Sequence, residues 1–252
     1  MDRLLSNSAT LKSIEKCDTC SVRHRAVCGA LTSEELRHLN QIARDKKISA
    51  GEVILSDEEP ASFVGIITSG AVKLTKTLAD GRQQIVGLQF ASDFIGRTYN
   101  DRNHFFAEAA TDVEVCSFLR HDFEVMLKKF PELENRLFQH TLDDLDAARD
   151  WMLLLGRKTA EEKVASFLLM LAKKSSVTGC HHTGTPAFAT FTLPITRTDM
   201  GDYLGLTIET VSRQITRLKT RKIISITGNR DFLVPDLSKL VEVAGYDISD
   251  ID

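Results

Sequence analysis

The stretch Ile195–Asp236, ITRTDMGDYLGLTIETVSRQITRLKTRKIISITGNRDFLVPD, contains the clearest structural signals in the C-terminal part of this chain. Thr196 can cap a first helix with Asp199 in its opening turn, and Gly205 can adopt the left-handed conformation that ends it. Thr207 can then cap a second helix. The stretch therefore predicts two short helices joined by a tight turn.

The second helix, which we expect to end near Thr220, has two chemically different faces. Val211, Ile215 and Leu218 share one face at helical spacing and are suited to burial. The opposite face carries Glu209, Ser212, Arg213 and Thr216. Arginine can donate two hydrogen bonds to guanine, glutamate can accept one from cytosine N4, and serine can serve either role. These are base-reading groups near the N-terminal end of the helix, where recognition helices enter the major groove.

The surroundings of this helix pair strengthen that interpretation. Downstream, ISITGNRDFLV alternates around Gly228 and Asn229 and predicts a β-hairpin, the wing of a winged helix-turn-helix. Residues 196–230 contain seven basic and three acidic side chains, a local charge of +4 in a chain of net charge −3. The residues expected to contact the phosphates of double-stranded DNA are Arg217, Lys219 and Arg221. A purely structural helix pair with a solvated basic face is the alternative.

The N-terminal segment Glu15–Gly29, EKCDTCSVRHRAVCG, raises a second question. Cys17, Cys20 and Cys28 follow the spacing C-x2-C-x7-C, and Cys116 lies far along the chain on a predicted strand. Four thiolates can bind an iron–sulfur cluster. A distant fourth ligand would tie this polar arm, which shows no pattern of a fold of its own, to the rest of the protein.

Two other readings of these thiols remain open. His24 lies between Cys20 and Cys28, so the pattern C-x2-C-x3-H-x3-C could bind zinc. Alternatively Cys116 is a buried apolar residue and the thiols are inert or form disulfides. A reducing compartment makes structural disulfides rare, and clustered thiols there are more often metal ligands or redox groups.

The fifth cysteine lies in a different context. Cys180 stands beside His181 and His182 in a loop rich in glycine, serine and threonine. These three residues could bind a metal, but we expect them to be incidental residues of a flexible surface loop.

Between the cysteine arm and the helix pair, the spacing of the apolar residues changes from that of a helix to that of strands and back again. Thr32 and Glu35 form a capping box that opens an amphipathic helix. Short β-rich runs separated by turn glycines then predict a compact antiparallel barrel or sandwich. These runs are Glu52–Leu55, Phe63–Gly70, Ala71–Leu78, Gln83–Phe90 and Val113–Phe118.

From Pro131 to about Leu155 the apolar period is helical, and a second helix, Ala160–Ser175, follows. A single helix over the first range would be about 37 Å long, which favours a seam between two copies of the chain over a helix lying on its own core. The predicted seam residues are Phe138, Thr141, Leu145, Ala148, Met152 and Leu155. Repulsion within the neighbouring run DDLDAARD would weaken such a seam.

Composition narrows the class of protein. The chain has 252 residues, 42% apolar and 27% charged, as expected for globular domains with real cores. No apolar run approaches the roughly 18 residues of a membrane span, and the opening residues lack a secretory signal, so we expect a cytoplasmic protein without membrane contact. No nucleophile with a matched base, phosphate loop or paired-carboxylate motif is recognisable, so we do not expect an enzyme.

Together, the β-rich region, the long helix and the run GDYLGLTIETVSRQITRLK resemble the CRP/FNR superfamily of bacterial transcription regulators. With the cysteine triplet and Cys116, the chain is similar to the FNR branch in its FnrL- or FnrN-like form, from about Cys17 to Leu240. The resemblance implies an α+β fold with an antiparallel β-roll sensor domain like that of cyclic-nucleotide-binding proteins, a long dimerisation helix and a C-terminal winged helix-turn-helix. The expected domains are a cysteine-rich arm (1–30), the β-roll (31–130), the dimerisation helix (131–158) and the DNA-binding domain (159–252).

The resemblance also implies a function. Cys17, Cys20, Cys28 and Cys116 would ligate an oxygen-labile [4Fe-4S] cluster, and a homodimer would bind its operator while the cluster is intact. Residues Glu209, Ser212 and Arg213 would read a TTGAT-like half-site in a two-fold-symmetric DNA operator. RNA polymerase is the expected second partner, and the turn Ala79–Gln84, ADGRQQ, is a candidate contact.

The chain departs from the pattern of the family at several positions. Cyclic-nucleotide-binding members have a glutamate after the pocket glycine and an arginine followed by serine or threonine. Here Arg97 follows Gly96, and Asn103 and His104 stand about where that pair would be, so no cyclic nucleotide is expected. Ala148 replaces an acid that FNR proteins can carry on the seam, which predicts appreciable dimer even without the cluster.

Two alternative functions remain. A zinc-stapled or thiol-redox regulator of the same fold would respond to a different input. An iron–sulfur redox protein, whose helical domain only mediates assembly, would not bind an operator.

Overall fold

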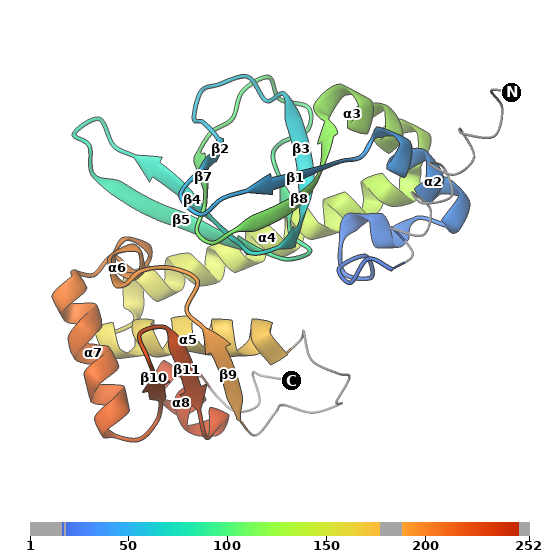
Figure 1. Cartoon of the computed structure of the whole chain (residues 1–252). Helices are drawn as coiled ribbons and strands as arrows, with labels where there is room; N and C mark the ends of the chain where they lie inside the picture. Colours follow the sequence, from blue (N-terminus) through green and yellow to red (C-terminus); the bar gives the residue numbers. More distant parts are fainter. Residues whose placement is uncertain (1–16, 18, 177–187, 247–252) are drawn as a thin grey trace, which may run out of the picture. The chain divides into compact units, whose positions relative to one another are not determined.

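The computed structural model describes residues 17, 19–176 and 188–246. The chain divides into two compact units, Met1–Asp146 and Ala147–Asp252. The division falls inside the long helix α4 (Pro131–Arg157), so each unit holds one part of that helix (Figure 1). No described helix combines the length and apolar character required to cross a membrane.

Two four-stranded antiparallel sheets form the β-roll of the first unit, as predicted (Figure 1). In spatial order, one sheet contains β1 (Arg44–Ile48), β8 (Val113–Leu119), β3 (Phe63–Ser69) and β6 (Phe94–Ile95). The other contains β2 (Val53–Leu55), β7 (Phe106–Ala109), β4 (Ala71–Thr77) and β5 (Gln83–Phe90). The predicted runs all form strands, whereas β1, β6 and β7 were not anticipated.

Strands β3 and β8 separate two apolar cores because alternate side chains of a strand point to opposite faces. Ile67 and Val115 belong to the core that lies between the sheets. Ile66 and Phe118 belong to the core on the outer face, where helices cover the sheet. The helices that contribute to this outer core are η1 (Val27–Ala30), α2 (Ser33–Ile42), α3 (Arg120–Lys129) and the start of α4.

The capping box predicted for α2 is present. The Thr32 hydroxyl accepts a hydrogen bond from the Glu35 backbone N–H, and the Glu35 carboxylate accepts one from the Thr32 N–H at 2.9 Å. The Thr32 N–H and the Thr32 hydroxyl, which donates to the same carboxylate at 2.8 Å, hold the pKa of Glu35 below its usual range. Because the cap fixes where α2 begins, Leu36 and Leu39 point into the outer core.

The second unit is the predicted winged helix-turn-helix. It contains α5 (Ala160–Ser176), β9 (Ala189–Thr192), α6 (Arg197–Leu204), α7 (Ile208–Thr220), β10 (Ser225–Thr227), β11 (Asp231–Val234) and α8 (Leu237–Ala244). Thr196 caps α6 in a capping box with Asp199, and Thr207 caps α7. Gly205 ends α6 with φ 61° and ψ 42°, a left-handed conformation that costs glycine little.

Apolar and aromatic contacts fix the helix pair within this unit. Val211, Ile215 and Leu218 of α7 are buried, as their spacing predicts. The ring of Tyr203 on α6 stacks on that of Trp151 on α4, with 3.8 Å between ring centroids. The recognition-like helix α7 therefore presents a defined opposite face to solvent.

Candidate functional site

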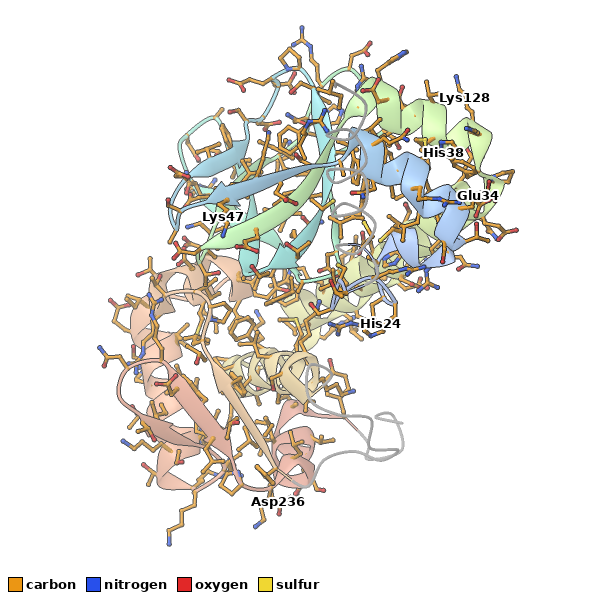
Figure 2. The ribbon with its side chains drawn as sticks, turned by 45° about the vertical axis from the view of Figure 1, so that its right-hand side comes forward. His24, Glu34, His38, Lys47, Lys128 and Asp236 are labelled. Carbon is orange, nitrogen blue, oxygen red and sulfur yellow. The ribbon has the colours of Figure 1, made fainter. Side chains whose placement is uncertain are left out.

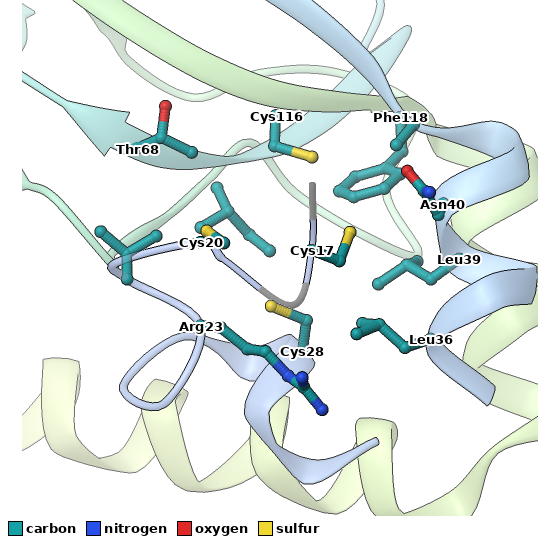
Figure 3. Close-up of a pocket in the computed structure, with 13 residues that line it drawn as sticks. Cys17, Cys20, Arg23, Cys28, Leu36, Leu39, Asn40, Thr68, Cys116 and Phe118 are labelled. Carbon is teal, nitrogen blue, oxygen red and sulfur yellow. The ribbon is translucent and has the colours of Figure 1, made fainter. Parts of the chain in front are cut away.

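The four predicted cysteines lie around one cavity in the first unit (Figure 3). Cys17, Cys20 and Cys28 come from the N-terminal segment, and Cys116 comes from β8. The cavity has a volume of about 40 Å³, roughly three times what a single water molecule needs. The structure thus brings together thiols from two segments that are far apart in the sequence.

Strand register directs Cys116 into this cavity. Cys116 pairs with Asp45 of β1 on one side and with Ile66 of β3 on the other. Its neighbours Val115 and Ser117 point to the opposite face of the sheet, where Val115 is in the core between the sheets. A slip of one residue in this pairing would turn the Cys116 thiol away from the other three.

The cysteine triplet is held by its own packing, which differs from the expected arm without structure. Val22, Ala26 and Val27 are 4%, 0% and 0% exposed and belong to the outer core. Fully burying a valine side chain stabilises a fold by roughly 1.5–3 kcal/mol. Residues 20–30 are therefore anchored to the β-roll by apolar contacts that do not depend on a metal.

A close backbone approach shapes the loop between Cys20 and Cys28. A Cβ on Gly29 would lie 2.6 Å from the backbone oxygen of Arg23, closer than side-chain carbons occur. The Arg23 guanidinium in turn donates to the Leu31 carbonyl at 3.5 Å. Glycine at position 29 lets the chain fold back and aim Cys28 at the cavity.

The electrostatics of the cavity disfavour four ionised thiols by themselves. Burial, followed by the neighbouring thiols of Cys20 and Cys17, raises the pKa of Cys28 to about 11, against a smaller lowering by Arg23. The other lining residues are largely apolar, including Leu36, Leu39, Ile66 and Phe118. Thiolates here need a positive partner, which iron ions would supply.

The described residues contain no ready-made site for a single metal ion. Within the described residues, no three side chains of histidine, cysteine, aspartate or glutamate converge closely enough to hold one ion. Zinc would require every sulfur about 2.3 Å from one point, whereas each thiolate of a cubane cluster binds a different iron. His24, the proposed fourth zinc ligand, is exposed and does not line the cavity (Figure 2). The four thiols without His24 are a donor set that iron–sulfur clusters use and that structural zinc can also use.

The other metal candidate, Cys180 with His181 and His182, lies outside the described residues.

A hydrogen bond joins the cysteine segment to α4. Nε2 of His140 lies 3.0 Å from the backbone oxygen of Arg25, which stands between Cys20 and Cys28. A carbonyl oxygen only accepts, so this bond requires a hydrogen on Nε2. This contact could not be predicted from the sequence because the two residues are 115 positions apart.

The predicted seam of α4 is largely exposed. Phe138 and Met152 are 60% and 68% exposed, far more than is usual for such side chains. The exposed seam residues are Phe138, Thr141, Leu145, Ala148 and Met152, to which the structure adds Leu142 and Leu153. Leu155 differs, because it is partly buried and its Cδ2 lies 3.8 Å from where a Cβ on Gly205 would be.

The expected acidic run lies along the same helix. Its residues Asp143, Asp144, Asp146 and Asp150 are all exposed. Like charges this close on a helix repel one another and a second copy of the same surface.

The predicted base-reading residues occupy the solvent face of α7. Glu209, Arg213 and Thr216 are exposed, and Ser212 is half-buried. The backbone N–H of Glu209, the Thr207 hydroxyl and the Arg213 charge lower the pKa of Glu209. Its carboxylate is therefore ionised at neutral pH and can accept hydrogen bonds. The Arg213 guanidinium donates to the Thr210 hydroxyl at 3.1 Å, which orients it along the helix.

The predicted phosphate-contacting residues Arg217, Lys219 and Arg221 are also exposed, toward the C-terminal end of α7. One partner was not anticipated. The Glu161 carboxylate, in the first turn of α5, lies 2.6 Å from Nη1 of Arg221 and 3.5 Å from Nε of Arg217.

The positions where cyclic-nucleotide-binding members hold the phosphate have other contacts here. Asn103 is 4% exposed, and its backbone N–H donates to the Glu59 oxygen at 3.0 Å. Nearby, Nδ2 of Asn100 lies 3.1 Å from Nε2 of His104. That the chain binds no cyclic nucleotide stays a prediction.

Comparison with known proteins places both units in established families. Residues 45–130 match the cyclic nucleotide-binding domain, and residues 162–243 match the Crp-like helix-turn-helix domain. The chain is 44% identical over 234 residues to the transcriptional activator protein FnrL of Cereibacter sphaeroides, covering 93% of this chain and 94% of that protein. It is 39% identical over 215 residues to the nitrogen fixation regulation protein FixK of Bradyrhizobium diazoefficiens, covering 83% and 86% respectively.

A solved structure agrees with these relatives. The structure of FixK2 from Bradyrhizobium japonicum is 34% identical to this chain and superimposes with a TM-score of 0.71, over 80% of this chain and 97% of that one. The β-roll, the long helix and the winged helix-turn-helix are thus shared. The chain therefore belongs to the FNR branch of the CRP/FNR superfamily of transcription regulators.

Proposed function

We propose that this chain is an oxygen-responsive transcription regulator that binds a [4Fe-4S] cluster through Cys17, Cys20, Cys28 and Cys116. With the cluster intact, a homodimer binds a palindromic TTGAT-type DNA site and controls transcription under low oxygen. The observation that carries the proposal is the placement of four cysteines from two distant segments around one cavity. The relative named as a transcriptional activator, FnrL, and the Crp-like domain support the regulatory part.

The residues around the cavity would have different roles in holding the cluster. When bound, the cluster would supply an oxygen-labile inorganic core that compensates the charge of four thiolates. Cys28 and Cys116 stand on backbone that is already anchored, by the outer core and by the paired strand β8. Arg23 adds positive charge beside Cys28. Leu36, Leu39 and Phe118 keep bulk water from the thiolates.

The link from the cysteines to DNA binding runs through α4. His140 holds the Arg25 carbonyl, so a change in the Cys20–Cys28 loop reaches the helix that carries the exposed seam. That seam supplies apolar area for a second copy, whereas the exposed aspartates oppose the association. A balance between such opposing terms needs only a few kcal/mol to shift occupancy strongly.

The dimer would present two α7 helices to successive turns of the major groove. Arg213, Glu209 and Ser212 read bases, and Arg217, Lys219 and Arg221 contact phosphates. Activation would use RNA polymerase as a second partner. The turn Ala79–Gln84 is a candidate contact because residues 79–83 are exposed and the Asp80–Arg82 ion pair, at 2.9 Å, presents a defined polar tip.

One anaerobic experiment tests the proposal. Reconstituted protein is expected to contain about four iron ions per chain, to show a broad visible absorption, and to bind a TTGAT-type duplex more tightly than a scrambled one. Brief aeration should bleach the absorption and lower both the dimer fraction and operator binding. Protein that stays free of iron, or that binds the operator equally well after bleaching, contradicts the proposal.

A further inference from the structure

A single carboxylate holds two of the basic residues of α7. Glu161 lies 2.6 Å from Nη1 of Arg221 and 3.5 Å from Nε of Arg217. Its side chain is 19% exposed, whereas those of Arg221 and Arg217 are 47% and 61% exposed. The Glu161 side chain is thus largely covered by the second unit, whereas the two arginine side chains are exposed to solvent.

Helix geometry explains how one acid reaches both arginines. Arg221 directly follows α7, and its backbone N–H still donates to the Arg217 oxygen at 3.0 Å, so the two arginines lie one turn apart on the same face. Helix α5 packs against α7 within the second unit, and Glu161 is in the first turn of α5. The three side chains together carry a charge of +1, where the two arginines by themselves would carry +2.

We propose that Glu161 is a built-in competitor for DNA phosphates and thereby sets the strength and salt dependence of DNA binding. The proposal rests on the DNA-binding part of the proposed function. Glu161 accepts a hydrogen bond from Nη1 of Arg221, and its carboxylate lies 3.5 Å from Nε of Arg217, so it engages part of the donor set that a phosphate oxygen would use. A phosphate that takes over these groups also approaches the Glu161 carboxylate, which repels it.

The consequence concerns the balance between backbone contacts and base contacts. Phosphate contacts strengthen binding to every sequence and carry no sequence information directly. Because a regulator must find its site among a large excess of other DNA, excessive phosphate affinity lowers the share of protein on the operator. Glu161 restrains Arg217 and Arg221 but does not touch Arg213, for which the structure records a bond to Thr210.

The chain offers a matched control beside Glu161. Glu162 carries the same charge in the same helical turn, but its carboxylate caps α5 by accepting from the Thr159 backbone N–H at 2.7 Å. Glutamine can perform that capping role. Glu161→Gln and Glu162→Gln therefore remove one negative charge each, and only the first releases the two arginines.

Fluorescence anisotropy of full-length cluster-loaded protein, with operator and scrambled duplexes over a range of potassium chloride, tests the proposal. We expect Glu161→Gln to bind both duplexes roughly three- to tenfold more tightly at low salt, with a logarithmic salt slope steeper by up to about 1. Glu162→Gln should match the wild type. In an Arg217→Gln/Arg221→Gln background, Glu161→Gln should have no effect.

Three results would overturn the proposal. Weaker binding by Glu161→Gln would mean that the acid orients the arginines for contact. Equal changes in both single variants would assign the effect to net charge. If Glu161→Gln tightens binding equally in the background without the two arginines, the arginines are not responsible for the effect. If the wild type does not prefer its operator, that result counts against the proposed function. The proposal about Glu161 can still be tested, because the salt slopes can be compared on any duplex.

Discussion

Nε2 of His140 lies 3.0 Å from the backbone oxygen of Arg25 and so connects the helix of the predicted dimer seam to the loop between Cys20 and Cys28. The loop is anchored by apolar side chains on one side and by this hydrogen bond on the other. If the contact transmits the state of the cysteines to α4, its removal should separate cluster binding from dimerisation.

For His140→Ala we expect normal iron content and visible absorption but a dimer fraction several-fold lower at micromolar protein. Losing one hydrogen bond costs about 0.5–1.5 kcal/mol, enough for a change of that size. Anaerobic analytical ultracentrifugation measures the dimer fraction. His121→Ala, at an exposed position of α3, is the control. Dimerisation of His140→Ala at wild-type strength, with the cluster intact, contradicts the coupling.

Cys116→Ser tests whether the distant thiol is a ligand. The replacement is nearly isosteric but places a hydroxyl at a largely apolar cavity, so we expect the free energy of unfolding to fall by up to about 1–3 kcal/mol. Iron content and visible absorption after anaerobic reconstitution should nevertheless fall to a small fraction of the wild-type values. Cys180→Ser, at the cysteine outside the proposed ligand set, should reconstitute normally. Equal cluster content in the two variants would remove Cys116 from the site.

Gly29→Ala tests the close approach in the cysteine loop. The new Cβ would meet the Arg23 oxygen at 2.6 Å, so the loop must shift. We expect a loss of about 1–3 kcal/mol in the free energy of unfolding, together with faster loss of iron to a chelator. Gly156→Ala, where nothing lies within 4 Å, should be neutral or slightly stabilising. Urea denaturation followed by circular dichroism compares them, and equal stabilities would refute the steric argument.

Arg213→Ala tests sequence reading separately from phosphate binding. The loss should be about 1–3 kcal/mol on the operator and should largely vanish on a duplex changed at the base pair that Arg213 reads. Lys219→Ala should weaken binding to all duplexes alike and reduce the logarithmic salt slope by about 1. Anisotropy titrations on a panel of singly substituted operators measure both variants. A uniform loss across the panel for Arg213→Ala would show that it does not read a base.

Much of the fold could be predicted because its signals are local. The caps at Thr32, Thr196 and Thr207 depend on side chains within three residues, and all three are present as expected. Strand β1 escaped prediction because its sequence, RDKKI, is charged and does not alternate. It is a strand only because the backbone of β8 pairs with it, and charged side chains are usual on such a sheet edge.

The same distinction between local and long-range signals applies to the candidate site. The spacing of the cysteine triplet and the chemistry of the α7 face can be read along the chain because each involves one short segment. Which side of β8 carries Cys116, and which arginines meet Glu161, depend on strand register and helix packing between residues far apart in sequence. The caps and the spacing of apolar residues follow from short segments of the amino-acid sequence. Which side chains meet follows from the folded arrangement, because contacts between distant residues arise when separate elements bury their apolar faces together.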